Sequence, residues 1–551
     1  MHYQITRKSI SSQYIEIKLF LDCKTNEEIH LQLAAWRPGR YELANYAQKI
    51  RGFKVENQNQ IIAWKKLNKD FWSFKAMESG EYLISYEYYC NQMDAGSCWS
   101  DDTQLYLNFS NFIFDIPERK GHAIRLSIEV PSDYKIATAM TLTGLNQWLA
   151  DSYQHLMDSP FLASGQLNHF TYQVDTCHFH LWFNGKIHFD VEKLVQDFRK
   201  FTAKQIQAFG EFPAKDYHFI FQLLPYKHYH GVEHAFSTVI TIGPAEKLKE
   251  KGELDELFGI SSHELYHFWN VCRLRPIELL EYDLSKEAYL DTGVVLEGVT
   301  TYMGDLFLLR SGYFSLKDYL LILEKKIQRE LDSFGWKNQS IVESSFDLWL
   351  DGYKQGIPDK KVNIYNRGAL LALCLDLILL ENGSSLSQVM KSMWEKFGKT
   401  RKGYKLEDFK ESIAEFILQK GEVDIFFNRF VFGHDDLSPL IFRLLDSIGI
   451  RVEESYSSNI LLHQWGIRTD EKGKIKQIHP ESLSYNYLML EDQILNFDEI
   501  NNNIPLRQLE IEVSRWNREL SFSIPMENRK FFPLYKLNFF QETPKLKKWM
   551  E

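Results

Sequence analysis

The sequence predicts a multidomain α+β protein with an N-terminal β-sandwich-like domain, a mostly helical central domain and a small β-rich C-terminal domain. The length of 551 residues suggests three or four domains at roughly 150 residues each. Apolar and polar residues alternate in the N-terminal third, and the period changes to that of helices near residue 190. We place the domains at residues 1–175, 176–438 and 439–551.

The N-terminal segment has the alternation that is typical of half-buried strands. Short stretches of this kind recur from Gln13 to about Asp175, among them Tyr14–Leu19 and Ile124–Val130, and turn residues such as Pro131 separate them. This pattern predicts an all-β domain.

The central segment begins where apolar residues recur at spacings of three and four. Residues 191–209 follow this spacing, which predicts a helix with Asp190 as its N-cap. Strands are predicted at 217–224 and 238–242, because proline or Gly-Pro stops each apolar run. Helical patterns then dominate from about residue 253 to residue 432.

The most apolar run, Ala369–Leu380, predicts a buried helix. Asp376 interrupts it, and it is shorter than the roughly 20 residues that a bilayer requires, so we expect no membrane association. Strand patterns return after Pro439, including a hairpin at 509–524 that turns at Asn517-Arg518. They predict the small C-terminal domain.

The composition excludes several classes of protein. Lys and Arg total 64 and Asp and Glu total 74, so the net charge of −10 argues against a nucleic-acid partner. The six cysteines are scattered without a CxxC pair, which favours reduced, mostly buried thiols. The first residues lack the apolar region of a secretory signal, so we expect a soluble, cytoplasmic protein.

An HExxH motif, His263-Glu264-Leu265-Tyr266-His267, lies inside a helical pattern. Four residues correspond to about one helical turn, so both imidazoles leave the same face and can share one cation. Neutral imidazoles suit zinc, and Glu264 lies alongside as a candidate general base for water bound to the metal. The motif predicts one zinc ion per chain.

Glu297 is the candidate for a third metal ligand. It follows His267 by 30 residues and begins another helical pattern. A catalytic zinc site takes three protein ligands and leaves one position open, and His263, His267 and Glu297 supply such a set. The alternative is a surface helix with two solvated histidines and an ordinary helical glutamate.

Two further segments are candidates for the active site. Gly231, Val232 and Glu233 lie between the two predicted strands, where an edge strand can bind a peptide and Glu233 can pair with its free amino group. A turn with a solvated glutamate is the alternative. Tyr365 precedes the buried helix, where its phenol can stabilise an oxyanion or serve only for packing.

Three neighbouring histidines, His228, His230 and His234, surround Glu233. Their spacing does not follow that of a metal site, although a minor metal role stays open. We expect them to line the substrate cleft or to be solvated.

Taken together, these motifs resemble the M61 family of zinc aminopeptidases, the glycyl aminopeptidase family. The resemblance rests on His263–Val271 with Arg273–Pro276, Leu296–Gly298 with Thr301-Tyr302, Gly231–His234, Tyr365 with Gly368, Trp36–Tyr41, Gly466-Ile467 and Asp492–Leu495. One departure is His230, which stands where the family usually has a second glycine before Gly231.

The resemblance implies a thermolysin-like catalytic domain, a PDZ-like C-terminal domain and a role for each residue. His263, His267 and Glu297 would bind zinc, and Glu264 would act as the general base. Tyr365 would stabilise the oxyanion. Glu233 would bind the α-ammonium of peptides that begin with a small residue such as Gly or Ala.

Two other functions stay open from the sequence. One is a peptide-binding scaffold with a vestigial peptidase domain. The other is a zinc hydrolase with endopeptidase activity or with a substrate that is not a peptide. The sequence also leaves open whether the chain forms a homo-oligomer.

Overall fold

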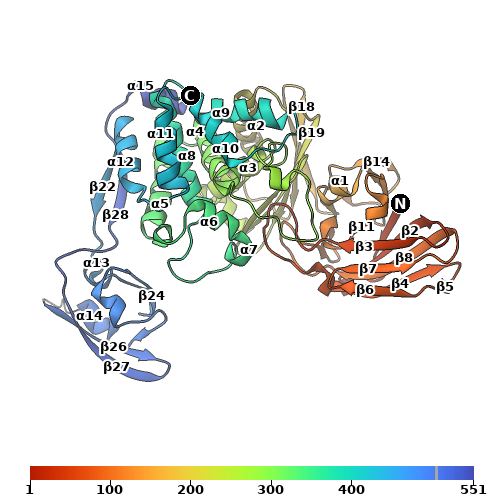
Figure 1. The fold of residues 1–551 in the computed structure, drawn as a ribbon, viewed down its shortest axis with the longest axis horizontal. Helices are drawn as coiled ribbons and strands as arrows, with labels where there is room; N and C mark the ends of the chain where they lie inside the picture. The colour runs from red at the N-terminus through yellow and green to blue at the C-terminus, as the bar shows by residue number, and fades with distance from the viewer. Residues whose placement is uncertain (503–506) are drawn as a thin grey trace.

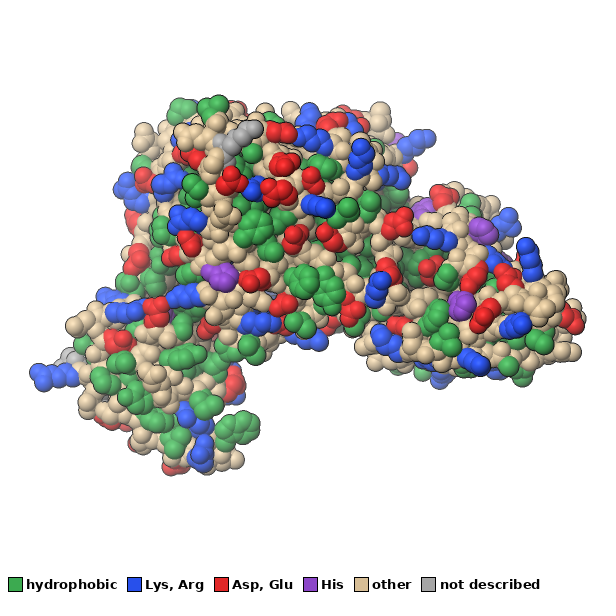
Figure 2. Space-filling model, viewed as in Figure 1, with side chains coloured by type: hydrophobic (Ala, Val, Ile, Leu, Met, Phe, Trp, Pro, Cys, Tyr) green, Lys and Arg blue, Asp and Glu red, His purple; other side chains and the backbone are tan. Residues whose placement is uncertain are grey.

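The structure is a computed structural model, and it describes residues 1–502 and 507–551. Figure 1 shows a β-rich N-terminal part, a central part in which helices gather around a sheet, and a small β-containing module at one end. The protein is therefore a multidomain α+β protein, as predicted. On the face seen in Figure 2, acidic and basic side chains are interspersed.

The N-terminal part contains an eight-stranded sheet and two four-stranded sheets. The eight-stranded sheet has the order β14-β15-β12-β1-β2-β8-β4-β5, and the smaller sheets have the orders β11-β3-β7-β6 and β13-β16-β10-β9. The elements are β1 (His2–Thr6), β2 (Tyr14–Cys23), β3 (Glu28–Leu33), β4 (Ile50–Asn57), β5 (Gln60–Ile61), β6 (Trp64–Asn68), β7 (Phe71–Lys75), β8 (Gly80–Tyr89), β9 (Trp99–Ser100), β10 (Gln104–Leu107), β11 (Phe114–Asp115), β12 (Ile124–Ile128), β13 (Lys135–Thr138), β14 (Thr141–Gly144), β15 (Gln147–Ala150), α1 (Tyr153–Met157) and β16 (Phe161–Ser164).

Two of these sheets face each other across an aromatic core. Residues of β2 are alternately buried and more exposed, as the apolar alternation predicts. The ring of Phe53 on β4 lies 5.7 Å from that of Trp72 on β7, and Tyr86 on β8 lies 5.1 Å from Phe114 on β11. These contacts join the eight-stranded sheet to the β11-β3-β7-β6 sheet.

The central sheet has the order β17-β18-β19-β21-β20, with β20 as an edge strand. Its strands are β17 (Asn168–Val174), β18 (Cys177–Asn184), β19 (Asp216–Leu223), β20 (His228–Glu233) and β21 (Ser237–Gly243). Helix α2 (Val191–Phe209) packs on this sheet, with Phe198 edge-on to Phe219 at 5.3 Å. Asp190 caps α2 as predicted, because its carboxylate accepts from the Lys193 amide at 3.1 Å.

The helices after the sheet are α3 (Lys251–Tyr266), α4 (Thr300–Arg310), α5 (Leu316–Leu331), α6 (Ile341–Phe346), α7 (Leu348–Asp351), α8 (Asn366–Glu381), α9 (Leu386–Met393), α10 (Leu406–Ala414), α11 (Lys420–Phe426) and α12 (Ser438–Ser447). Helix α8 is almost fully buried, as its composition predicts. Within residues 1–502 and 507–551, no single helix is long and apolar enough to cross a membrane.

Two glycines let α8 lie close to the segment that carries Glu297. A Cβ atom on Gly298 would lie 2.5 Å from the Cα atom of Gly368, so neither position has room for a side chain. This close approach places Tyr365, which precedes α8, beside Glu297.

The C-terminal module is inserted between two paired strands. Strand β22 (Ile450–Ser455) pairs with β28 (Leu534–Phe539), and helix α15 (Pro544–Met550) follows. Between them lie α13 (Ile460–Trp465), β23 (Ile467–Thr469), β24 (Ile475–Ile478), β25 (Gln493–Ile494), α14 (Phe497–Asn502), β26 (Gln508–Arg515) and β27 (Arg518–Pro525). The module has its own apolar core, which includes Leu461, Trp465 and Ile511.

Elements on both sides of the predicted boundaries at residues 175 and 439 pair or pack with one another. Residue 175 lies in the turn between β17 and β18, and both strands belong to the central sheet. Helices α12 and α15 pack on the central part; the Trp549 indole, for example, donates to the Tyr302 hydroxyl at 2.8 Å. The predicted hairpin is confirmed as β26–β27, with Trp516 and Asn517 in left-handed conformations at its turn.

Candidate active site

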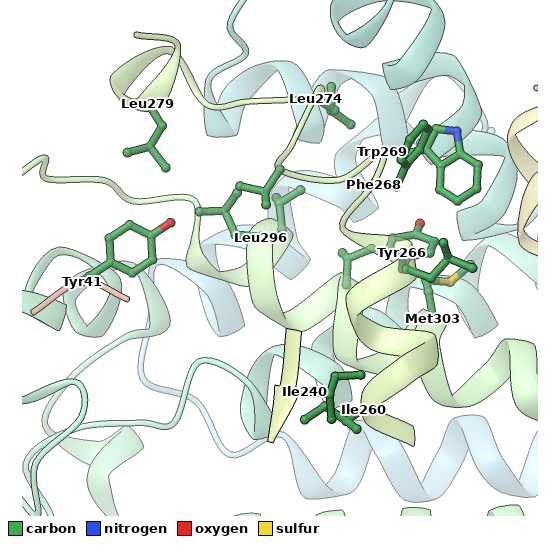
Figure 3. Close-up of a cluster of buried hydrophobic side chains, with 14 of the residues drawn as sticks. Tyr41, Ile240, Ile260, Tyr266, Phe268, Trp269, Leu274, Leu279, Leu296 and Met303 are labelled. Carbon is green, nitrogen blue, oxygen red and sulfur yellow. The ribbon is translucent and has the colours of Figure 1, made fainter. Parts of the chain in front are cut away.

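Helix α3 carries the HExxH motif into the interior. The Nε2 atoms of His263 and His267 lie 3.0 Å apart, and their rings are nearly perpendicular. The apolar residues that follow the motif pack around the C-terminal end of α3 (Figure 3). The Trp269 ring, for example, stacks on the Phe209 ring with centroids 4.5 Å apart. The predicted helical placement of the motif is therefore correct.

Glu297 reaches the same point from a π-helical turn, Val294–Val299, that leads into α4. Its Oε2 atom lies 3.6 Å from Nε2 of His263 and 3.5 Å from Nε2 of His267. This oxygen is buried and has no hydrogen-bond partner among the described residues. Two imidazole nitrogens and an unsatisfied carboxylate oxygen fit the donor set of a zinc site.

Asn270, which the sequence analysis did not single out, connects the two segments that carry these ligands. Its carbonyl oxygen lies 2.8 Å from Nδ1 of His267, so Nδ1 donates to it and Nε2 is the nitrogen that faces His263 and Glu297. Its side-chain amide donates to the Val295 carbonyl at 2.8 Å and to the Thr300 hydroxyl at 2.9 Å, across the π-helical turn. Such a turn often marks a functional site.

Burial and neighbouring charges shift the pKa values of His263, His267, Glu297 and Glu264. Burial lowers the pKa of His263. It also opposes the charged form of His267, but the adjacent Glu297 carboxylate prevails and raises the His267 pKa to about 10. The two imidazoles hold the pKa of Glu297 well below its usual range despite burial. Burial raises the pKa of Glu264 well above its usual value.

Tyr365 lies beside the same carboxylate. Its hydroxyl donates to Oε1 of Glu297 at 3.2 Å. Burial and the negative charge of Glu297 raise the Tyr365 pKa well above its usual value, so the phenol keeps its proton. A protonated hydroxyl at this place can donate to a developing oxyanion.

Strand β20 supplies a free sheet edge next to the motif. His234 donates its amide to the Ser237 carbonyl at 2.9 Å, and the Val232 carbonyl accepts from the Thr238 hydroxyl at 2.9 Å. Because hydrogen-bonding direction alternates along an antiparallel pair, the backbone groups of Gly231 and Glu233 face the open edge. These groups can bind an extended peptide.

Gly231 and Glu233 also lie against side chains of the HExxH motif. A Cβ atom on Gly231 would lie 2.2 Å from Oε1 of Glu264. Carboxylate oxygens of Glu233 and Glu264 and a nitrogen of His267 lie within 4.8 Å of one another. All of these side chains are strongly buried, with Glu233 9%, Glu264 5% and His267 2% exposed.

Val232, which was also predicted to bind substrate, is placed differently from Gly231 and Glu233. Its side chain points to the other face of β20, where it packs with Tyr106 and Leu162 of the N-terminal part. Strand alternation explains this, because neighbouring residues of a strand face opposite sides.

Two of the histidines around Glu233, His230 and His234, pair with aspartates of the N-terminal part. Nδ1 of His230 is bonded to a carboxylate oxygen of Asp94, and Nδ1 of His234 lies 3.0 Å from Oδ1 of Asp158. Asp158 also accepts from the Ala235 amide at 2.9 Å. These two aspartates of the N-terminal part therefore bind β20 at His230 and the segment that follows it at His234 and Ala235.

Comparisons with known proteins agree with this arrangement. Residues 2–165 match the family model of the peptidase M61 N-terminal domain, and residues 256–371 match that of M61 glycyl aminopeptidase. Together the two matches span just over half of the chain. A search of curated proteins finds no match.

One solved structure shares the fold over the whole chain. The crystal structure of an aminopeptidase N family protein from Idiomarina loihiensis is 24% identical, with a TM-score of 0.90 over the whole of both chains. An M1 zinc metallopeptidase from Deinococcus radiodurans is 14% identical over 79% of this chain and 94% of that one, with a TM-score of 0.48. Only the first of these likenesses is strong enough to establish a common fold.

Proposed function

The chain belongs to the M61 peptidase family, and from this premise we propose that it is a zinc-dependent aminopeptidase that removes small N-terminal residues, such as Gly or Ala, from peptides. One observation carries the proposal: two imidazole nitrogens and the Glu297 carboxylate converge beside Glu264, at a sheet edge that bears the Glu233 carboxylate. This arrangement combines a metal site with a site for a free amino group.

His263, His267 and Glu297 would hold one zinc ion per chain. Zinc at such a site polarises a carbonyl group and makes water a stronger nucleophile. Asn270 keeps the His267 ring in the tautomer that a metal requires. The Oε2 atom of Glu297 is buried and has no hydrogen-bond partner among the described residues. A bound cation would supply the partner that it lacks.

Glu264 is the general base of the proposed reaction. It takes a proton from the attacking water and later returns it to the leaving amine. Its Oε2 atom is buried and has no protein partner in the described part of the chain, so it is available to water. Burial raises its pKa, which strengthens it as a proton acceptor.

Gly231 and Glu233 orient the peptide. A substrate that runs antiparallel to β20 places its N-terminus near Glu233, where the carboxylate pairs with the ammonium group. A longer chain on the amino side would have to bury an uncharged amide against this carboxylate. The geometry thus favours exopeptidase over endopeptidase activity.

Tyr365 stabilises the negative charge that develops on the carbonyl oxygen. Its hydroxyl is buried and keeps its proton, and it already lies 3.2 Å from the proposed ligand Glu297. Loss of one such donor typically costs about 10²–10³-fold in kcat.

The variant Glu264→Gln tests the proposal. It should bind one zinc ion per chain and fold normally but lose turnover of alanyl and glycyl anilides, since an amide cannot accept the proton. N-acetylated anilides should resist the wild-type enzyme. A protein that takes up no zinc would instead favour a peptide-binding scaffold, and cleavage of the acetylated substrates would favour a different hydrolase.

A further inference from the structure

One loop of the N-terminal part reaches the edge strand of the active site. This loop, residues 91–98, lies between β8 and β9 and carries Asp94. Nδ1 of His230 on β20 is bonded to Oδ1 of Asp94, and Nε2 of His228, on the same face of the strand, lies 3.7 Å from the same oxygen. One carboxylate thus contacts two histidines of β20. We call residues 91–98 the bracket loop.

Buried side chains hold the bracket loop in place. The side-chain amide of Asn108 donates to the carbonyls of Ala95 at 3.3 Å and Ser97 at 2.7 Å. That of Asn111 donates to the Gly96 carbonyl at 3.1 Å. Asn108 and Asn111 are only 3% and 2% exposed. Because three successive carbonyls are bonded in this way, the loop has little freedom to move.

Arg37 contacts the same histidine from another segment of the N-terminal part. Its Nη2 atom lies 3.5 Å from Nε2 of His230, and a Cβ atom on Gly96 would overlap its Nε atom, so the guanidinium lies against the bracket loop. Burial lowers the pKa of His230, so the neutral ring donates through Nδ1 to Asp94 and accepts from Arg37 through Nε2. Burial opposes the charge of Asp94, but the hydrogen bond from His230 prevails and lowers the Asp94 pKa to about 2. The His230 ring is therefore fixed between a cation and an anion.

The direction of the bound peptide determines which part of β20 it meets. The proposed substrate has its ammonium at Glu233 and its scissile bond beside Gly231, next to the general base Glu264. Residues after the scissile bond therefore continue along β20 away from Glu233, toward its first residue, His228. At about 3.3 Å per residue, this stretch accommodates about three further residues.

Tyr229 is the residue of this stretch whose backbone can bind the peptide. Hydrogen-bonding direction alternates along the strand, so the backbone groups of Tyr229 face the open edge as those of Gly231 do. Tyr229 lies between His228 and His230, the two histidines that contact Asp94. The bracket loop is thus attached on both sides of this backbone group.

We propose that Asp94 is a positioning residue that acts through His230 and holds this half of β20 in place for the peptide chain that follows the scissile bond. This inference rests on the proposed aminopeptidase function. Asp94 should matter little for an anilide, which ends just after the scissile bond, and much more for a peptide that continues along β20. Asp158, by contrast, binds the segment beside Glu233, which both kinds of substrate need.

The expected effect is a rise in KM that depends on substrate length. A misplacement of about 1 Å in a positioning group can cost about 10²-fold. For Asp94→Ala, we expect the KM for tetraalanine to rise at least about tenfold and the KM for alanyl anilide to change by less than about twofold. A purely structural role would lower the fraction of active enzyme, and therefore kcat for both substrates alike, with KM unchanged.

The experiment compares initial rates with alanyl anilide and tetraalanine for wild type, Asp94→Ala, His230→Ala and the double variant. Because Asp94 acts through His230, the double variant should match His230→Ala instead of combining both single effects. Asp216→Ala is the matched control. It removes another aspartate–histidine contact of the same sheet, to His180 at 3.0 Å, on β19, which is not an edge strand.

Thermal unfolding identifies a variant that does not fold. If Asp94→Ala fails to fold, His230→Ala decides the result, because it must show the same dependence on substrate length. A folded variant whose KM for tetraalanine is unchanged, or whose KM rises equally for both substrates, overturns the positioning role alone. A wild type that binds zinc but releases alanine from neither substrate refutes the aminopeptidase and the positioning role with it.

Discussion

The contact between Gly231 and Glu264 leads to a sharp prediction for Gly231→Ala. The new Cβ atom would lie 2.2 Å from Oε1, 2.7 Å from Cδ and 3.0 Å from Cγ of Glu264. Ordinary contact begins at about 3.4 Å, so the carboxylate must move by roughly 1 Å. The strand cannot retreat easily, because β21 pairs with it on the other side.

A misplacement of this size in a catalytic group costs about 10²-fold in rate. We therefore expect kcat for alanyl anilide to fall roughly a hundredfold. Zinc content should stay at one ion per chain, because a Cβ atom on Gly231 has its three nearest contacts with Glu264 alone and with none of the three ligands. The assay pairs steady-state kinetics with metal analysis and thermal unfolding of the same preparation.

Gly259→Ala is the matched control. Gly259 lies on the helix that carries the motif, and a Cβ atom there meets nothing within 4 Å. Alanine should leave activity unchanged and stabilise the helix by about 0.5–1 kcal/mol. If Gly231→Ala keeps full activity, Glu264 does not react from its place beside β20, and the assignment of the general base is wrong.

Three more predictions concern contacts around the site and the module. Asp158→Ala removes the contacts with the His234 ring and the Ala235 amide, so the KM for substrate should rise while zinc content stays unchanged. An unaltered KM would show that Asp158 does not position the β20 edge. Asn270→Ala should weaken zinc binding about 10–100-fold in a chelator competition, since it frees the π-helical turn; unchanged affinity would contradict its role. His479 is buried among Phe334 of the central part and Phe531 and Phe532 of the C-terminal segment, and this burial lowers its pKa from 6.5 to about 4. Protonation of His479 is therefore unfavourable in this packed environment, and the contact between the module and the central part should weaken as the pH falls through this window. Hydrogen exchange of the C-terminal module, measured at pH 7.5 and at pH 5, checks this. His479→Phe should remove the difference in exchange between the two pH values, and His463→Gln should keep it.

Local patterns in the sequence predicted the parts of the site that depend on neighbours along the chain. The spacing of His263 and His267 fixes their common face, since both belong to one helical turn. The N-cap at Asp190 and the hairpin turn near Asn517 depend on residues only a few positions away. Each of these features follows from backbone geometry within one element.

Contacts between distant segments were not predictable in this way. Asp94 contacts His230 from 136 positions away, and Gly39 contacts Glu233 from a turn that follows β3 in the N-terminal part. No period or motif in either segment indicates its partner. The packing of α15 on the central part has the same cause, because the Trp549–Tyr302 hydrogen bond joins α15 to the first turn of α4, which is 247 positions away along the chain.

The balance of charge explains why such a site should select a free amino group. Three buried carboxylates, Glu233, Glu264 and Glu297, lie around two imidazoles, and the charge of the nearby Arg37 is offset by Asp94. With neutral imidazoles, a divalent cation leaves one negative charge uncompensated, and an ammonium group cancels it. An acetylated N-terminus cannot do so, and an uncompensated buried charge is costly.

Glu233→Gln should therefore reduce the preference for a free amino group rather than abolish the chemistry. We expect kcat/KM for alanyl anilide to fall, while any residual cleavage of the acetylated anilide stays the same or rises, because the zinc-loaded site is then neutral before substrate binds. Zinc content should be unchanged, since Glu233 is not among the three proposed ligands. An equal fall for both substrates would mean that Glu233 maintains the shape of the site, and the ammonium would then have to be recognised elsewhere.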